Sequence, residues 1–201
     1  MNLPNKITMA RILMIPLMVI IPFLGIQGEF KILGGLTYSN LITVMIFLIA
    51  SITDFFDGYL ARKNNLVTTF GKFLDPIADK LLVLAAMIML VEAGIIPAWI
   101  PIVIAAREFI VSGIRMLAAG EGNVIAASWL GKIKTVSQMI AITFAFLGKN
   151  TFLECLSGTL NGSALIINVL MSLGMIVAVV ATIWSGIDYF VKSKDIVLKS
   201  K

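Results

Sequence analysis

Four aspartates interrupt the apolar part of this chain, at positions where a soluble core would place leucines. They are Asp54, Asp57, Asp75 and Asp79. Apolar runs long enough to cross a lipid bilayer flank them on both sides. A carboxylate at the middle of a membrane costs about 2.5–3.5 kcal/mol on insertion scales, so four of them need a compensating partner. Bound divalent metal is the simplest partner for several carboxylates at once.

Composition places most of the chain in lipid. Hydrophobic residues make up 59% of the 201 residues, and the mean hydropathy is +1.01. This predicts an all-α integral membrane protein, with a single domain over residues 1–201. There is no histidine and one cysteine, Cys155, which excludes histidine ligands, histidine general bases and internal disulfides. A metal would have oxygen ligands, which favours Mg²⁺ or Mn²⁺ over Zn²⁺.

The hydropathy pattern predicts six transmembrane helices. They are placed at residues 7–25, 38–61, 73–93, 97–118, 130–148 and 163–190. The segments after the first, third and fifth helices hold only Lys31 and Lys149 of the sixteen Lys and Arg residues. The positive-inside rule therefore puts both termini and the loop at 62–72 in the cytoplasm. The metal site is then expected at the cytoplasmic end of the second and third spans.

The spacing of the aspartates places them on shared helix faces. Asp54 and Asp57 are three residues apart, and Asp75 and Asp79 are four apart, so each pair lies along one side of its helix. Two antiparallel helices can bring these faces together into one pocket, and carboxylates with substrate phosphate oxygens are the usual surroundings of Mg²⁺. The competing interpretation is an interfacial salt-bridge cluster with the nearby Lys and Arg residues.

Two glycines and one arginine accompany the aspartates. Gly58 and Gly71 leave the backbone open to a bulky diphosphate, although close helix packing also uses small residues. Arg62 suits a phosphate oxygen, and its alternative role is a cytoplasmic surface charge.

These residues together form the pattern D-x2-D-G-x2-A-R-x8-G-x3-D-x3-D, filled by Asp54, Asp57, Gly58, Ala61, Arg62, Gly71, Asp75 and Asp79. The pattern resembles, without departure, the signature of the CDP-alcohol phosphotransferases. The resemblance implies transfer of a phosphatidyl or similar group from a CDP-linked donor to an alcohol, with release of CMP. It also implies that the four aspartates hold Mg²⁺ or Mn²⁺, expected as two ions, and that Asp79 is the general base.

The N-terminal segment resembles the same family. Pro4-Asn5, Thr8 and Arg11 match its first-helix pattern, and their spacing puts Asn5, Thr8 and Arg11 roughly along one side. We expect these three to bind the CDP part of the donor, although Asn5 could cap the helix and Arg11 could be a snorkelling charge. The expected donor-binding set is completed by Asp54, Gly58, Ala61, Arg62 and Gly71.

Basic residues in the fourth and fifth spans indicate an acceptor that is itself anionic. Arg107 lies near the middle of its apolar run, and Glu108 is a possible partner although adjacent helical residues point about 100° apart. The expected acceptor-phosphate residues are Lys132, Lys134, Arg107 and Arg115. For the two lysines the alternative is cytoplasmic surface charge at the start of the fifth span.

The run Arg107-Glu108 to Arg115, followed by Gly131-Lys132-x-Lys134-Thr135, resembles the bacterial phosphatidylglycerophosphate synthase branch of that family. This implies CDP-diacylglycerol as donor and sn-glycerol 3-phosphate as acceptor. It further implies a homodimer surrounded by membrane lipid, with no nucleic-acid partner. The expected location is a bacterial cytoplasmic membrane, crossed several times, with the active site facing the cytoplasm.

Three other functions remain open at this point. A cardiolipin synthase or an inositol-phosphate-using synthase would keep the aspartate pattern and use another acceptor. A divalent-cation transporter would also place carboxylates in the membrane, but here they gather at one face. A lipid-binding protein without catalysis would not need all eight residues of the pattern.

Overall fold

The computed structural model describes residues 3–26, 28–30, 36–63, 69–120, 129–148 and 150–193. Their side chains are described except at 3–5, 29–30, 54–63, 69–73, 119–120, 130 and 192. Seven predicted site residues therefore have side chains outside the described part: Asn5, Asp54, Asp57, Gly58, Ala61, Arg62 and Gly71.

The described chain is almost entirely helical. The long helices are α1 (Leu3–Ile20), α2 (Tyr38–Lys63), α3 (Thr69–Glu92), α4 (Trp99–Gly120), α5 (Trp129–Leu147) and α6 (Gly162–Lys192). Shorter elements are the 3₁₀ turns η1 (Ile21–Leu24) and η3 (Glu154–Ser157) and an antiparallel pair of two-residue strands, β1 (Glu29–Phe30) and β2 (Leu36–Thr37). Each predicted span coincides with one long helix, so the predicted helices are confirmed as helices.

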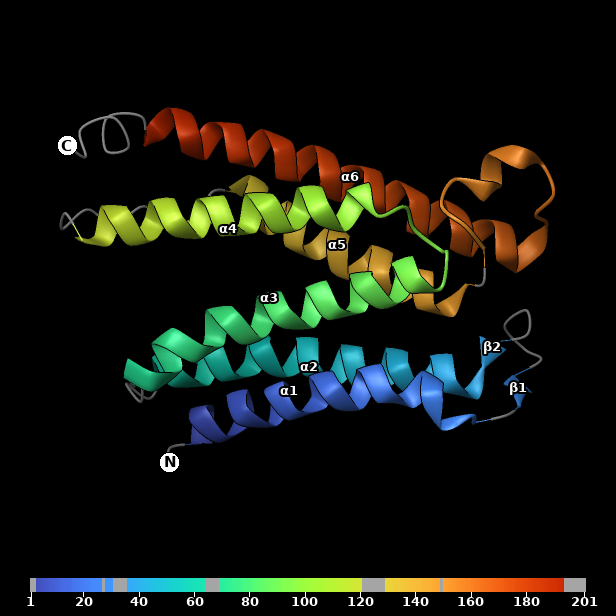
Figure 1. Ribbon diagram of the computed structural model, residues 1–201, viewed down its shortest axis with the longest axis horizontal. Helices are drawn as coiled ribbons and strands as arrows, with labels where there is room; N and C mark the ends of the chain where they lie inside the picture. The colour runs from blue at the N-terminus through green and yellow to red at the C-terminus, as the bar shows by residue number, and fades with distance from the viewer. Residues whose placement is uncertain are drawn as a thin grey trace.

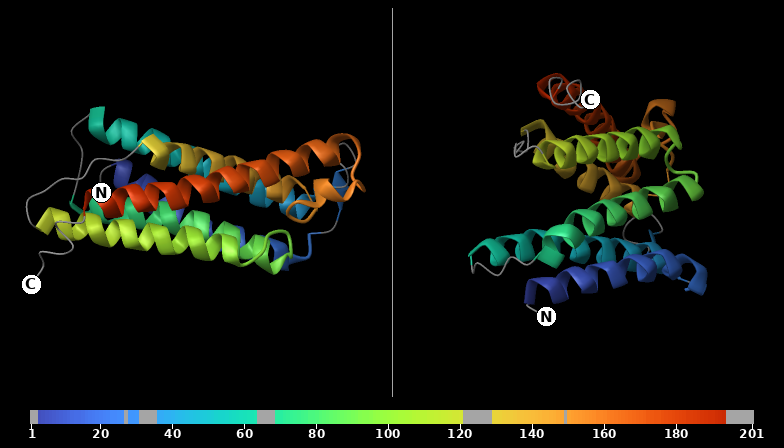
Figure 2. Two further views of the ribbon diagram at one scale, coloured as in Figure 1. Left: turned by 90° about the horizontal axis from the view of Figure 1, so that it is seen from above. Right: turned by 60° about the vertical axis from the view of Figure 1, so that its left-hand side comes forward.

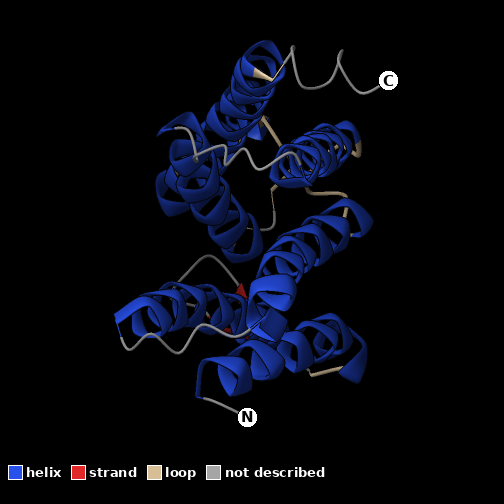
Figure 3. Ribbon diagram, turned by 90° about the vertical axis from the view of Figure 1, so that its left-hand side faces the viewer, coloured by secondary structure: helices blue, strands red, loops and turns tan. Residues whose placement is uncertain are grey.

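The helices run alternately back and forth along one axis (Figure 1). Helices α1, α2 and α3 lie together, α4, α5 and α6 lie together, and contacts of α2 with α5 and of α3 with α4 and α5 join the two groups (Figure 3). The first residues of α1, α3 and α5 and the last residues of α2, α4 and α6 share one end of the bundle (Figures 1 and 2). We call it the polar end, because the candidate site lies there.

Helix α3 ends at a left-handed glycine. Gly94 has φ of +71°, a conformation that side chains rarely adopt, and its N–H donates to the Val91 carbonyl at 3.0 Å. The N–H of Ile95 donates to the Leu90 carbonyl at 2.9 Å, which satisfies a second free carbonyl. Pro97 then follows before α4 begins. This turn returns the chain toward the polar end.

Helix α6 buries several polar side chains and exposes large apolar ones. Its buried side chains include Asn168, Ser172 and Thr182, while Leu173 and Trp184 are exposed. In water this distribution would be costly, but in lipid it satisfies polar groups internally and presents apolar groups to the acyl chains. Within the residues that the structure describes, the segments Lys6–Leu24 and Gly162–Val191 are long and apolar enough to cross a membrane. Helices α3 and α4 carry charged residues within their length, and Asp75, Asp79, Arg107, Glu108 and Arg115 among them belong to the candidate site.

The core joins both groups of helices. Buried apolar residues from all six long helices pack in one cluster that includes Met18, Phe47, Met87, Ile100 and Met175. Helices α5 and α6 approach closely at Gly174, where an added Cβ would lie 3.0 Å from the Ala141 Cβ and 3.3 Å from the Ser137 carbonyl oxygen. Such small residues let helix backbones approach each other in membrane proteins.

Candidate active site

The first turns of α3 bring Asp75 and Asp79 to the polar end. Both are partly buried, and their spacing of four places them one turn apart on one face. The Thr8 hydroxyl on α1 donates to Asp75 Oδ1 at 2.6 Å, and Thr8 is 2% exposed. A buried hydroxyl bonded to a carboxylate fixes the direction in which its oxygens point. Thr8, which the sequence assigned to donor binding, thus contacts a predicted metal ligand.

Arg11 lies buried between α1 and α2. It is 1% exposed, and its Nε donates to the Ala50 carbonyl at 3.2 Å. The guanidinium therefore does not snorkel to a surface, which was the alternative to a donor-binding role. Ala50 precedes Asp54 by one helical turn, so Arg11 is anchored next to the part of α2 that carries the first predicted metal ligands.

The carboxylate oxygens of this region are suitable ligands for Mg²⁺ or Mn²⁺. Asp75 and Asp79 supply oxygen ligands from one helix face, and α2 remains helical past Asp54 and Asp57, which keeps those two positions on one side of its last turns. Among the described side chains there is no group of three or more potential metal ligands. The predicted four-carboxylate cluster needs Asp54 and Asp57, whose side chains lie outside that set.

All four predicted acceptor-phosphate residues line one pocket. Arg107 and Arg115 come from α4, and Lys132 and Lys134 come from α5. Tyr189 of α6 completes the wall of this cationic pocket, whose volume is about 470 Å³. That volume lies within the range of about 300–1,000 Å³ that ligand pockets usually have. Residues that are 27 positions apart along the chain, Arg107 and Lys134, meet because α4 and α5 both reach the polar end.

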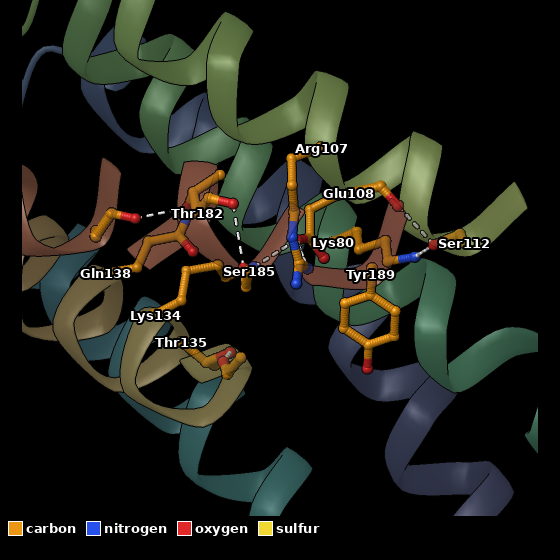
Figure 4. A network of polar contacts seen from close by, with 12 residues as sticks. Lys80, Arg107, Glu108, Ser112, Lys134, Thr135, Gln138, Thr182, Ser185 and Tyr189 are labelled. Carbon is orange, nitrogen blue, oxygen red and sulfur yellow. Dashed lines mark hydrogen bonds and ion pairs between the residues drawn. The ribbon is translucent and has the colours of Figure 1, made fainter. Parts of the chain in front are cut away.

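Glu108 joins the two helices of the pocket. Its Oε1 accepts a hydrogen bond from Arg107 Nη1 at 2.7 Å and another from Lys134 Nζ at 2.6 Å (Figure 4). The pairing of neighbours Arg107 and Glu108, considered from sequence, is confirmed. The ion pair between Glu108 and Lys134 was not predicted, because nothing in the sequence indicates which residue of α5 faces Glu108.

Tyr189 contacts both arginines of the cationic pocket. The guanidinium carbons of Arg107 and Arg115 lie 5.5 Å and 5.0 Å from its ring centroid, and Arg115 Nη2 donates to its hydroxyl. Its ring is almost fully buried, whereas Arg107 is partly buried and Arg115 is exposed, so the contact with Arg107 is the better shielded from water. The Nε of Arg107 is buried and has no hydrogen-bond partner in the described part of the chain. Sequence reasoning missed Tyr189, since one tyrosine near the end of an apolar helix carries no local signal.

A second, smaller pocket of about 70 Å³ lies between α3, α4 and α5. Asp79 and Lys80 line it on the α3 side, and it shares Glu108, Lys134 and Thr135 with the cationic pocket. The Lys80 ammonium donates to the Ser112 hydroxyl, which ties α3 to α4 beside Asp79 (Figure 4). The predicted base and the predicted acceptor pocket are therefore neighbours.

Comparison with known proteins identifies the family of the chain. Relatives named CDP-diacylglycerol–glycerol-3-phosphate 3-phosphatidyltransferase include that of Bacillus subtilis (strain 168), 47% identical over 194 residues, with 96% of this chain and 95% of the relative covered. That of Rickettsia typhi is 40% identical over 94% of this chain and 95% of its own, and that of Haemophilus influenzae 38% identical over 98% and 96%. The family model of the CDP-alcohol phosphatidyltransferases matches residues 1–185, and the chain belongs to this family.

Proposed function

We propose that this protein transfers the phosphatidyl group of CDP-diacylglycerol to sn-glycerol 3-phosphate, giving phosphatidylglycerophosphate and CMP. The observation that carries the choice of acceptor is the pocket lined by Arg107, Arg115, Lys132 and Lys134 beside Asp79. A phosphate monoester needs such a pocket, whereas choline or ethanolamine would be repelled by it. The names of the relatives agree with this substrate pair.

Asp79 is the proposed general base. Its carboxylate takes the proton of the acceptor hydroxyl as that oxygen bonds to the phosphorus of the phosphatidyl group, and the bond from that phosphorus to CMP breaks. Asp79 borders the pocket that adjoins the cationic pocket, so a hydroxyl a few bonds from a bound phosphate is placed to reach it. Position matters more than basicity here, because an ordinary aspartate is a weak base in water.

Asp54, Asp57, Asp75 and Asp79 are the proposed ligands of Mg²⁺ or Mn²⁺, with two ions expected. When bound, the metal polarises the donor's phosphate and neutralises charge on the departing CMP. Thr8 supports this arrangement by holding Asp75 through its hydroxyl. We therefore assign Thr8 an indirect part in donor binding, through Asp75.

The CDP part of the donor is proposed to lie over the ends of α1 and α2. The proposed donor-binding residues are Asn5, Thr8, Arg11, Asp54, Gly58, Ala61, Arg62 and Gly71. Support comes from Arg11, which is anchored against α2 one turn before Asp54. Arg107 and Arg115 are proposed to bind the acceptor's phosphate together with the two lysines of α5. One guanidinium group can donate two parallel hydrogen bonds to the oxygens of a phosphate.

All six long helices are proposed to cross a bacterial cytoplasmic membrane, with both termini and the active site on the cytoplasmic side. Support comes from the exposed apolar side chains of α6 and from the start of α1 and the end of α6, which both lie at the polar end. With Cys155 replaced by serine, single cysteines in the 62–72 loop and near Thr159 should react with membrane-impermeant thiol reagents from opposite sides of the membrane.

We also propose a homodimer, which light scattering of the detergent-solubilised protein would measure.

The reaction is tested by CMP release from CDP-diacylglycerol with Mg²⁺ or Mn²⁺, with and without sn-glycerol 3-phosphate. Release that requires metal and glycerol 3-phosphate is the expected result. Release only with inositol phosphate or phosphatidylglycerol would refute the acceptor and keep the family chemistry. No release with any alcohol would refute the proposed function.

A further inference from the structure

The two pockets at the polar end share lining residues, and two of these form an ion pair. Glu108 and Lys134 line both pockets, and their side chains are 20% and 7% exposed. On one side of this pair lies Asp79, and on the other lie Arg107, Arg115 and Lys132. The ion pair therefore lies where the pocket that Asp79 lines adjoins the cationic pocket.

Glu108 makes the contacts that an anionic ligand of this pocket would make. Its Oε1 accepts from both Arg107 and Lys134 and is the carboxylate among four cations that line the cationic pocket. A phosphate dianion carries more charge than a carboxylate and has three free oxygens as acceptors, so it binds guanidinium and ammonium groups more strongly. It can also supply an acceptor to the Arg107 Nε, which Glu108 leaves without one.

We propose that Glu108 determines specificity by competing with the acceptor's phosphate for Lys134 and Arg107. A phosphate monoester displaces the carboxylate, the ion pair between Glu108 and Lys134 separates, and the acceptor's hydroxyl reaches Asp79. A neutral alcohol such as glycerol leaves the ion pair closed and is rejected. This inference rests on the proposed function for the identity of the acceptor, but its first test needs no reaction.

A simpler role for Glu108 predicts the opposite change in phosphate affinity when its charge is removed. If Glu108 only held Lys134 in place for phosphate, removing its charge would disorder Lys134 and weaken phosphate binding. If Glu108 competes with phosphate, removing its charge strengthens phosphate binding. Any gain must also depend on Lys134, because a general loss of negative charge would act on the other cations as well.

The test is calorimetric titration of the purified, metal-free protein in detergent with inorganic phosphate. We expect Glu108→Gln to bind phosphate about tenfold more tightly than the unaltered chain, a typical size for the coupling of two groups in contact. In a Lys134→Gln background the same change should give less than about a twofold gain. Glu92→Gln, an exposed change near the far end of α3, is the matched control and should leave phosphate affinity unchanged.

Equal or weaker phosphate binding by Glu108→Gln overturns the proposal, as does a full tenfold gain that persists without Lys134. Glu108→Asp provides a second variant should the glutamine variant fold poorly. It keeps the charge and withdraws the carboxylate by one methylene, and we expect about threefold tighter binding. Failure of CMP release by the unaltered chain would refute the proposed reaction alone, because these titrations contain no donor lipid.

Discussion

Replacing Tyr189 separates the two ways in which α6 supports the cationic pocket. Tyr189→Phe removes the hydroxyl that accepts from Arg115 and keeps the ring beneath Arg107 and Arg115. Tyr189→Leu removes both. A hydrogen bond to a charged group contributes about 1.5–3 kcal/mol, and each cation–π contact contributes about 0.5–2 kcal/mol, the upper value applying to buried rings.

Only part of this energy should appear in catalysis, because the arginines can find other partners when freed. We therefore expect KM for sn-glycerol 3-phosphate to rise about threefold to tenfold in Tyr189→Phe and about tenfold to a hundredfold in Tyr189→Leu. The change should lie in KM, with kcat altered less than about threefold, since the pocket binds a phosphate that takes no part in bond breaking.

The assay is CMP release at saturating CDP-diacylglycerol over a range of glycerol 3-phosphate concentrations. Phe190→Leu is the matched control, because Phe190 is the next residue along α6 and its ring is exposed on the outer side. The reasoning fails if Tyr189→Leu matches Phe190→Leu in KM, or if kcat falls while KM stays constant. The first result would remove Tyr189 from acceptor binding, and the second would place it in the chemical step.

Three further predictions concern the other parts of the site and fold. Asp79→Asn should lower kcat about 10²–10⁴-fold while phosphate affinity in titrations stays within about twofold, because a lost base affects proton transfer and not the phosphate pocket. Thr8→Val should raise the Mg²⁺ concentration needed for half-maximal CMP release about tenfold, with Thr8→Ser restoring it, since the hydroxyl orients Asp75. Gly174→Ala should destabilise the protein by about 1–3 kcal/mol in thermal unfolding in detergent, because its Cβ would press on α5. Gly113→Ala, whose Cβ would meet nothing within 4 Å, should leave the unfolding temperature unchanged or higher.

The helices could be predicted because each corresponds to a long, mainly apolar run in the sequence, and turn residues separate one run from the next. The turn between α3 and α4 contains Gly94 and Pro97, which end one helix and delay the next. The pairing of Asp75 with Asp79 on one face also follows from spacing alone. How Asp54 and Asp57 complete that cluster stays a prediction, since their side chains lie outside the described residues.

The contacts between helices could not be predicted in the same way. Basic residues in the fourth and fifth spans predict that Lys132 and Lys134 bind the acceptor, and that pattern says nothing about which residues face them. Glu108 and Tyr189 acquire their roles only when α4, α5 and α6 lie side by side. Helical periodicity identifies the residues of one face, whereas the rotation of each helix about its axis depends on the packing of the whole bundle.

The partly buried ion pair of Glu108 and Lys134 is better explained by function than by stability. Taking two charges out of water costs several kcal/mol per ion, and well-packed apolar residues of similar volume usually stabilise a protein as well or better. Two apolar side chains at these positions would suit a chain with 59% hydrophobic residues. A carboxylate set among four cations is therefore retained at a cost in stability. Competition between this carboxylate and a phosphate for the same cations explains why the carboxylate is retained. The phosphate titrations measure that competition.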